Sequence, residues 1–252
     1  MFVPLSDENA LQSIRRQYVT IAIIIVCIVI YLLEMSAGIP NVDVGCRSLA
    51  GSFAVVPSDL RQVGFSSIAA RGPCDVLAVP EALTLLTYAF MHGDPMHLIG
   101  NMLFLWVFGD NVEDALGHGR FAAFYLLCAI AGGIVHAVVA NLLTPEDSLV
   151  PLIGASGAVA GVITAYLLLY PRVRVWVLAF RFIPLRIPAM FALGVWIVSQ
   201  FVMLLLPATG PIAWWAHVGG IIAGAILVIL MRRPGVPLFA EALPPPRVTP
   251  SS

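Results

Sequence analysis

The 252-residue sequence contains no lysine, and only 11% of its residues are charged. A soluble domain typically carries about a quarter of charged residues, so this chain could not cover a water-facing surface of ordinary size. The 13 basic residues, all arginine, are balanced by 14 acidic ones, which excludes a nucleic-acid-binding surface built on excess positive charge. Because 60% of the residues are apolar, the sequence predicts an integral membrane protein.

Six long runs contain no Asp, Glu, Arg or Lys, and a transmembrane helix needs about 20 predominantly apolar residues. One of the six is less uniform, because it opens with His97 and Asn101 before it becomes apolar. The predicted fold class is an all-α integral membrane protein, a bundle of six transmembrane helices. The runs are residues 18–33, 95–108, 121–143, 149–170, 187–206 and 212–231.

The arginines predict an orientation, because cytoplasmic loops collect positive charge. With the N-terminus inside, ten of the 13 arginines lie in cytoplasmic segments and three in outer loops. Residues 1–17 would then be a cytoplasmic N-terminal segment, and residues 18–233 the six-span membrane domain, with a long outer loop at about 36–94. The Pro-rich tail, residues 234–252, is expected to be cytoplasmic and disordered.

The four cysteines divide by location. Cys27 and Cys128 lie within predicted spans and are interpreted as small apolar packing residues. Cys46 and Cys74 share the outer loop, where an oxidising compartment would allow a disulfide. The sequence leaves open whether that bridge forms.

No Asp or Glu lies in the middle of a predicted span, and the sequence has no H-E-x-x-H motif. These absences exclude a carboxylate proton relay, a pair of intramembrane catalytic aspartates and a zinc protease of the usual helical type. Polar side chains inside a membrane are costly, so each one is a functional candidate. The candidates are His97, Asn101, His136, Asn141, Ser156, Gln200 and His217.

Four of these candidates are expected at one depth. In the predicted orientation, the runs that contain Asn101, Ser156 and His217 all start at the outer surface. At about 1.5 Å per residue, the three side chains lie roughly 8–10 Å below that surface. His97 is one helical turn above Asn101 on the same face. A shared depth favours a common site over scattered packing residues.

Small residues follow two of the candidates at helical spacing. Gly157 and Gly161 follow Ser156, and Gly220 and Gly224 follow His217. Such small-xxx-small faces let helix backbones approach closely in lipid. Packing the two faces together would bring the serine hydroxyl beside the imidazole, as nucleophile and general base. Because the spans offer no third acid, a Ser-His dyad is implied.

Three motifs together resemble a known family. Gly154-Ala-Ser156-Gly157 resembles the G-x-S-G nucleophile motif of rhomboid intramembrane serine proteases. The spacing of His92, His97 and Asn101 is similar to their second-span signature. Ala216-His217-x-x-Gly220-x-x-x-Gly224 is similar to their sixth-span signature. The resemblance covers roughly residues 18–233.

The resemblance implies a role for each matched residue. Ser156 would be the nucleophile and His217 the general base, while His97, Asn101 and the backbone N–H of Ser156 would form the oxyanion hole. Structural roles near the site would belong to His92, Gly154, Gly157, Gly220 and Gly224. No metal and no cofactor would be needed.

The sequence departs from the family pattern in two places. A Trp-Arg pair that is common before the first histidine is replaced by Leu83-Thr84. An aromatic residue that often stacks on the catalytic histidine is replaced by Ala160, and Trp214 or Trp215 could take its place.

The remaining candidates are interpreted without a catalytic role. His136, Asn141 and Gln200 are taken as packing or interfacial residues, and His118 as a solvated loop residue. The run 175–182, which contains Trp176, is taken as an interfacial anchor.

The sequence thus predicts an intramembrane endopeptidase that cleaves transmembrane segments of single-span or multi-span membrane proteins near the outer face. The alternative is a catalytically silent rhomboid-like protein that binds membrane segments for quality control or trafficking. A small transporter is disfavoured, because the polar cluster is shallow and uncharged. The expected location is a bacterial inner membrane, with the site facing the outer side. The expected partners are the lipid bilayer and substrate proteins. Neither a nucleic acid nor a metal is expected as a partner.

Overall fold

A computed structural model describes residues 3–36, 52–63, 79–144, 148–179, 182–206 and 213–240. Cys46 and Cys74 lie outside these residues, as do much of the predicted outer loop and the tail from residue 241 onward. Cys27 and Cys128 are buried and free, in agreement with their interpretation as packing residues.

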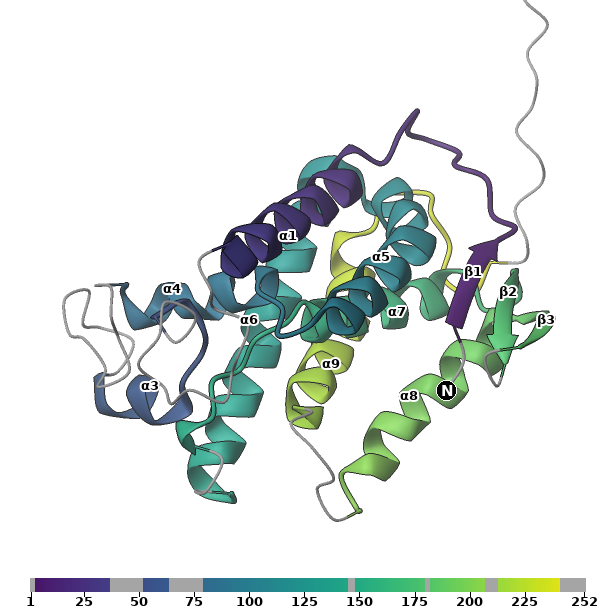
Figure 1. Ribbon diagram of the computed structural model, residues 1–252. Coiled ribbons are helices and arrows are strands. Elements are labelled where there is room, and N and C mark those ends of the chain that lie inside the picture. Colours follow the sequence, from purple (N-terminus) through teal and green to yellow (C-terminus); the bar gives the residue numbers. More distant parts are fainter. Residues whose placement is uncertain are drawn as a thin grey trace, which may run out of the picture.

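Most of the described chain is helical, and each of the six apolar runs contains a helix (Figure 1). Helices α5 and α6 meet at Gly117, whose φ of 85° suits glycine in the turn between them. The six helices are α1 (Tyr18–Ser36), α5 (Pro95–Leu116), α6 (His118–Leu142), α7 (Ser156–Leu169), α8 (Ala189–Met203) and α9 (Trp214–Met231).

Three of these helices, α1, α6 and α9, are long and apolar enough to cross a membrane by length and composition. Helices α7 and α8 are apolar but only 14 and 15 residues long. Helix α5 has 22 residues but carries Asp110, Glu113 and Asp114 toward its C-terminal end. The count of six spans therefore stays a prediction.

Helix α1 buries only a narrow face. Its buried residues are Thr20, Ile23 and Cys27, whereas Val29 and Leu32 are among the large apolar side chains that it exposes. An apolar surface of this extent is unfavourable in water. It is the surface expected of a helix that contacts lipid.

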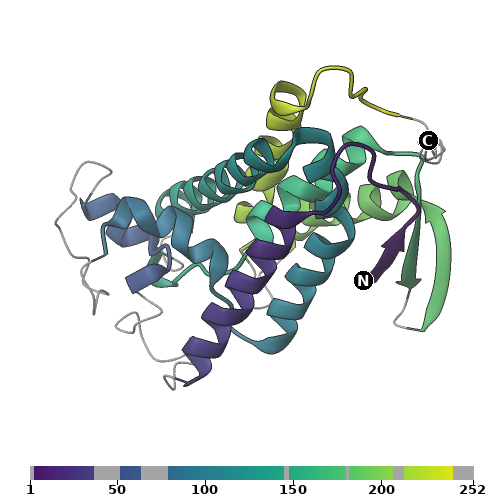
Figure 2. The ribbon, with the colours of Figure 1, turned by 90° about the horizontal axis from the view of Figure 1, so that it is seen from above.

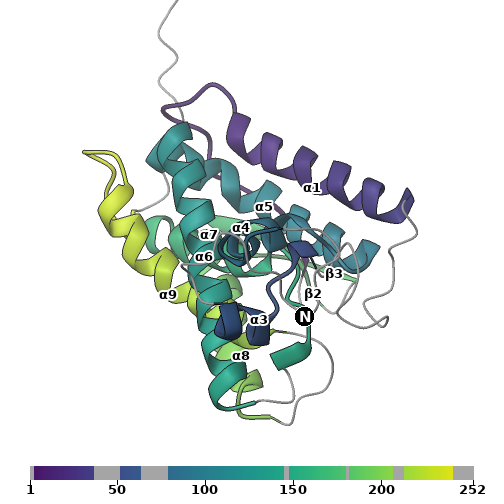
Figure 3. The same ribbon diagram turned by 90° about the vertical axis from the view of Figure 1, so that its left-hand side faces the viewer.

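Helix α7 lies at the centre of the bundle and packs against α5, α6, α8 and α9 (Figures 1 and 3). Every residue from Gly157 to Tyr166 is buried. Small side chains along this helix let its neighbours approach closely. The N-terminal end of α7, where Ser156 lies, is therefore held from several sides.

A three-stranded antiparallel sheet corrects the prediction of a purely helical fold. Its strands are β1 (Val3–Asp7), β2 (Arg174–Ala179) and β3 (Ile183–Pro188), in the order β1-β2-β3. The sheet lies at one edge of the bundle, near the start of α8 (Figure 2). The expected interfacial anchor at 175–182 therefore belongs largely to strand β2, where Val175 and Val177 are buried and Trp176 faces outward.

Carboxylates of α5 fasten the N-terminal segment. Asp114 accepts hydrogen bonds from the backbone N–H groups of Gln12, Ser13 and Ile14 at 2.7–2.9 Å. Glu113 accepts from the backbone N–H groups of Val19 and Thr20 and from the Thr20 hydroxyl, which caps the start of α1.

His118 is not the solvated loop residue that the sequence suggested. It is the first residue of α6, and its Nδ1 lies 2.5 Å from Oε1 of Glu113.

Two further segments pack on the bundle. Part of the predicted outer loop forms the short helices α3 (Pro57–Val63), α4 (Glu81–Thr87) and η1 (Tyr88–Phe90). After α9, the backbone N–H groups of Phe239 and Ala240 donate to the carbonyls of Leu168 and Leu169. Residues 234–240 of the predicted disordered tail thus contact the end of α7, and residues 241–252 lie outside the described part.

Candidate active site

Ser156 is the first residue of α7. The first N–H groups of a helix have no acceptor within it, so the Ser156 N–H is free to donate outward. Gly154, just before, has φ of 121°, and its N–H donates to the Tyr88 carbonyl at 2.9 Å. A Cβ at Gly154 would lie 2.6 Å from Cε1 of His97, so only glycine fits between the loop and this ring.

His217 lies in the first turns of α9, with 8% of its surface exposed. Its Nε2 is 2.8 Å from Oγ of Ser156, which is hydrogen-bonding distance. Glycines make this approach possible. A Cβ at Gly220 would lie 1.8 Å from the Gly157 carbonyl oxygen, and one at Gly224 would lie 2.4 Å from that of Gly161.

Gln200 of α8 is a third member of this chain of contacts. Its Oε1 lies 2.8 Å from Nδ1 of His217, and its Nε2 donates to the Trp196 carbonyl and to the Ser199 hydroxyl. Because Nε2 already has two acceptors, the carbonyl side of the amide faces the imidazole. Nδ1 of His217 must then carry the proton, and Nε2 is left to accept from Ser156.

The sequence interpretation of Gln200 as a packing residue missed this contact. Asn101, Ser156 and His217 lie in runs that are predicted to start at the outer surface, whereas the run 187–206, which contains Gln200, is predicted to end there. Counted back from residue 206, Gln200 lies roughly 9 Å deep, the same level as the other polar residues. This shared depth was the sequence signal that could have linked Gln200 to the candidate site.

His97 and Asn101 lie on one face of α5, near its start. Asp94 caps this helix by accepting from the N–H groups of Met96 and His97, both at 2.9 Å. Asn101 is 7% exposed, and its Nδ2 is buried with no hydrogen-bond partner among the described residues. A buried donor without a partner is costly, so it is a candidate for binding a ligand oxygen.

His92 packs beside His97, with ring centroids 5.2 Å apart. Burial, together with the nearby charge that His97 can carry, lowers the pKa of His92 to about 3. His92 is therefore neutral at physiological pH and acts here as a packing partner of the His97 ring.

Two tryptophans flank the ring of His217. Trp214 contacts it edge-on at a centroid distance of 5.6 Å, and Trp196 of α8 lies at 6.2 Å with a tilt of 31°. Ala160, which stands where the family often has an aromatic residue, is fully buried. Aromatic contact with His217 thus comes from α8 and α9 and not from α7.

The other polar candidates have different surroundings. Nδ2 of Asn141 donates to the carbonyls of Pro57 and Ala137 at 2.6 and 2.9 Å, and so ties the end of α6 to α3. Within the described ranges, no three His, Cys, Asp or Glu side chains are grouped closely enough to hold a metal ion.

The candidate site lies at the end of the bundle opposite Arg120 and Arg233. His97, Ser156 and His217 lie near the N-terminal ends of α5, α7 and α9. Arg120 and Arg233 lie where α6 begins and after α9 ends, next to the C-terminal end of α5. The orientation of these ends relative to a membrane stays a prediction.

Comparisons with known proteins agree on one family. A family model described as the rhomboid domain matches residues 80–234, more than half of the chain. RHOMBOID-like protein 12, mitochondrial, of Arabidopsis thaliana is 31% identical over 161 residues, 60% of this chain and 46% of that protein. Rhomboid protein 1, mitochondrial, of Saccharomyces cerevisiae is 29% identical over 158 residues, 59% of this chain and 41% of that protein.

A bacterial protein matches a shorter stretch. Rhomboid protease GluP of Bacillus subtilis is 38% identical over 92 residues, 36% of this chain and 17% of that protein. This chain spans less than half the length of these three relatives. Two of them are named as mitochondrial, so the prediction of a bacterial inner membrane gains no support from them.

The residues matched by the family model run from α4 to α9 and include every residue of the candidate site. The chain is an integral membrane protein and belongs to the rhomboid family.

Proposed function

We propose that this protein is a serine endopeptidase that cleaves peptide bonds of other membrane proteins within or next to their membrane segments. The observation that carries the proposal is the 2.8 Å contact between Oγ of Ser156 and Nε2 of His217. The contact of Nδ1 with Gln200 supports it, because it leaves Nε2 unprotonated and able to accept the hydroxyl proton. The Bacillus subtilis relative is named a rhomboid protease, which supports the same activity.

In the first step, Oγ of Ser156 attacks the substrate carbonyl carbon while its proton passes to Nε2 of His217. The imidazolium that forms keeps its Nδ1 proton in the hydrogen bond to Oε1 of Gln200. This acceptor is neutral, so it orients the ring and stabilises the developing charge less than a carboxylate would. The result is a Ser-His dyad with a positioning amide.

Negative charge develops on the carbonyl oxygen in this step, and donors aimed at it lower the barrier. Nδ2 of Asn101 is the best-supported donor, because it is buried without a partner in the described part of the chain. The N–H of Ser156 and the ring of His97, held beside Gly154, are the others.

In the second step, Nε2 of His217 returns its proton to the leaving amine, and the acyl group remains on Ser156. A water molecule then gives one proton to Nε2 of His217 and attacks the acyl carbon. The bond between that carbon and Oγ of Ser156 breaks, Nε2 returns its proton to Oγ, and the product with the new carboxyl group is released.

The proposed topology has six spans with both termini in the cytoplasm and the site near the outer face. Support comes from the arginines at the end of the bundle opposite the site.

The test is cleavage of a single-span reporter protein by the detergent-purified enzyme and by its Ser156→Ala and His217→Ala variants. We expect cleavage by the parent and loss of at least 10³-fold in each variant, because each removes a member of the dyad. A fluorophosphonate probe should label the parent at Ser156 and should not label the Ser156→Ala variant.

Two results would contradict the proposal. One is cleavage at the parent rate by either variant, with both purified free of other proteases. The other is a folded parent that neither cleaves a panel of reporters nor reacts with the probe, which would favour the silent, segment-binding alternative.

A further inference from the structure

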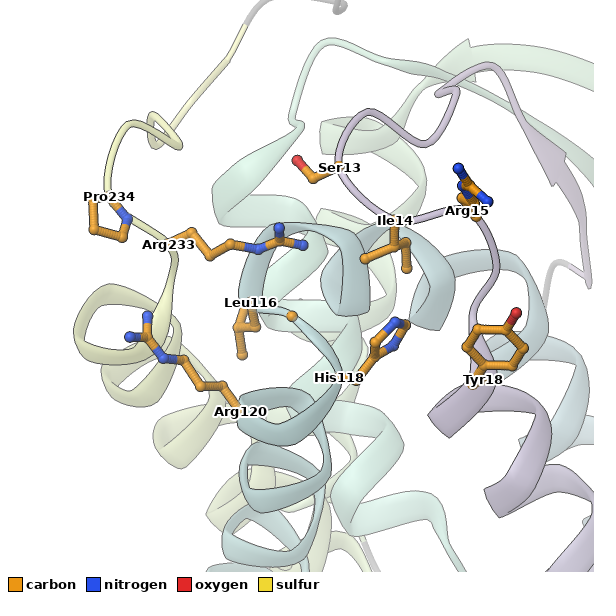
Figure 4. A pocket seen from close by; sticks show the side chains of 10 residues that line it. Ser13, Ile14, Arg15, Tyr18, Leu116, His118, Arg120, Arg233 and Pro234 are labelled. Atoms are coloured by element: carbon orange, nitrogen blue, oxygen red, sulfur yellow. The ribbon is translucent and has the colours of Figure 1, made fainter.

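A second polar site lies at the opposite end of the bundle from Ser156. A pocket of about 630 Å³ opens beside the turn between α5 and α6 (Figure 4). Three arginines line it. Arg15 comes from the N-terminal segment, Arg120 from the first turn of α6, and Arg233 from the residues after α9. No carboxylate is among its lining residues.

No ion pair joins these arginines to a carboxylate in the described part of the chain. Nη2 of Arg233 donates to the backbone carbonyl of Asp114 at 2.5 Å, and Nη1 of Arg120 to that of Met231 at 3.4 Å. The nearby carboxylates are engaged elsewhere, that of Asp114 with backbone N–H groups and that of Glu113 with α1 and His118. Neutral carbonyls thus orient the guanidinium groups of Arg120 and Arg233, and the three arginines exceed the two nearby carboxylates by one positive charge.

Unpaired donors face the same space. Nε of Arg233 is buried without a hydrogen-bond partner among the described residues, next to Gly117. Gly117 is the N-cap of the 25-residue helix α6, and no side chain caps this helix. The N–H groups of its first turn therefore lie beside the arginines at the pocket, and the arginine contacts with the Asp114 and Ala115 carbonyls take up the C-terminal end of α5. Arginines, free N–H groups and a helix N-terminus are the elements of a phosphate site.

The position of the pocket along the bundle indicates which phosphate compound could reach it. Tyr18 at the start of α1, His118 at the start of α6 and Arg233 after α9 all line it. These are the three helices that are long and apolar enough to cross a membrane. In the proposed topology, on which this inference rests, their common end lies at the level of lipid headgroups, and basic pockets between helices at that level bind anionic headgroups.

We propose that this pocket binds a phosphate group, and its height favours the headgroup of an anionic phospholipid over free phosphate. The bound group would contact the N-terminal segment, the α5–α6 turn and the segment after α9 together. It would therefore hold three chain segments in place that are far apart in sequence.

The test uses the 252-residue protein in detergent and measures its thermal midpoint and the lipid it retains. Phosphatidylglycerol, phosphatidylcholine and inorganic phosphate are titrated separately. The variants are Arg15→Gln, Arg120→Gln and the double variant; Arg233 is left unchanged because its contact with Asp114 is structural. The control is Arg174→Gln on β2, which makes the same charge change outside the pocket.

We expect phosphatidylglycerol to raise the midpoint and phosphatidylcholine to have little effect. Each arginine near a membrane surface contributes about a fivefold change in affinity, so the double variant should bind roughly 25-fold more weakly. The Arg174→Gln control should bind like the parent. Stabilisation by millimolar inorganic phosphate alone, lost in the double variant, would support the site and assign it to free phosphate. Equal weakening in the control and the double variant, or no response to any of the three compounds, would overturn the proposal.

Discussion

At the scale of single residues, the position of the proton on His217 depends on an amide in another helix. Gln200 offers an acceptor to Nδ1 because both of its own N–H groups are already used. The bond is worth about 1.4 kcal/mol if it behaves like an ordinary neutral hydrogen bond. An interaction of that size changes a rate by about tenfold.

Replacing Gln200 tests this positioning role. Gln200→Leu should lower kcat about tenfold and leave KM nearly unchanged, because the side chain orients the base and does not contact substrate. Gln200→Glu keeps an acceptor oxygen and should restore most of the activity. Steady-state kinetics on a reporter peptide measure both constants. An unchanged kcat in the leucine variant, or no recovery with glutamate, would assign Gln200 to packing alone.

Asn101 gives a prediction that separates activity from stability. Asn101→Ala should lower kcat by 10² to 10³, the usual effect of losing one oxyanion donor. The thermal midpoint should stay the same, because Nδ2 has no protein partner to lose in the described chain.

Asn141→Ala is the matched control for that prediction. Its Nδ2 makes two hydrogen bonds to backbone carbonyls, so the variant should lose stability and keep its kcat. A parallel loss of stability and activity in both variants would argue against a special role for Asn101.

Most residues of the candidate site could be predicted from the sequence, because the depth of a residue can be counted along an apolar run. Ser156, His97, Asn101 and His217 share a level when counted inward from the outer surface. Gln200 required a count in the opposite direction. No count along the chain predicts the lateral order of helices, so the partner of Nδ1 could not be named from sequence.

At the scale of elements, the close contact between α7 and α9 brings the serine to the histidine. Gly157 faces Gly220 and Gly161 faces Gly224, and any Cβ at Gly220 or Gly224 would overlap the backbone of α7. The contact therefore depends on glycine at these positions. These close contacts explain why small residues recur at helical spacing after Ser156 and after His217.

Gly220→Ala should separate α7 from α9, destabilise the fold by at least 1–3 kcal/mol and abolish cleavage. Gly194→Ala on α8 is the control, because a Cβ there meets nothing within 4 Å. Thermal unfolding and reporter cleavage measure the two effects. Full activity in the Gly220→Ala variant would show that the helices tolerate a wider spacing than the site geometry suggests.

The helices could be predicted from apolar runs, but the pairing of β1 with β2 could not. Strand β2 alternates buried Val175 and Val177 with exposed Arg174 and Trp176, a period of two that suits a strand. Its partner β1 lies more than 160 residues away in sequence, with the pairing Asp7↔Val175. A pairing over that distance leaves no local pattern, whereas the alternation in β2 and its nearby partner β3, with the pairing Ala179↔Ile183, were local signals that the interpretation as an interfacial anchor missed.

At the scale of the whole molecule, the N-terminal segment fastens one end of the bundle. Strand β1 pairs with β2, and Oδ2 of Asp7 accepts hydrogen bonds from Nδ2 of Asn111 at 2.9 Å and from the Tyr166 hydroxyl at 2.6 Å. The side chain of Asp7 thus joins the sheet to α5 and α7. Its protonation should affect the stability of the whole fold.

Burial raises the pKa of Asp7 from 3.8 to about 6, with a smaller contribution from the charge of Glu8, and the Tyr166 hydrogen bond offsets part of the rise. Between these two pH values the folded state holds a proton that the unfolded chain has released. The free energy of unfolding therefore falls as pH rises from about 4 to about 6, by at most about 3 kcal/mol from this group.

Asp7→Asn removes this titration and keeps an acceptor for Asn111 and Tyr166. Relative to the parent, its thermal midpoint should be nearly equal at pH 4 and several degrees higher at pH 7, because the parent then carries a buried charge. Glu8→Gln is the control, and its effect on stability should depend on pH in the opposite direction. The reason is that the hydrogen bond from Arg186 lowers the pKa of Glu8. Any stability lost in that variant should be seen at neutral pH and should vanish in acid. A midpoint difference between parent and Asp7→Asn that stays constant from pH 4 to pH 7 would mean that Asp7 is not the titrating group, because only a proton exchanged on unfolding makes the difference depend on pH.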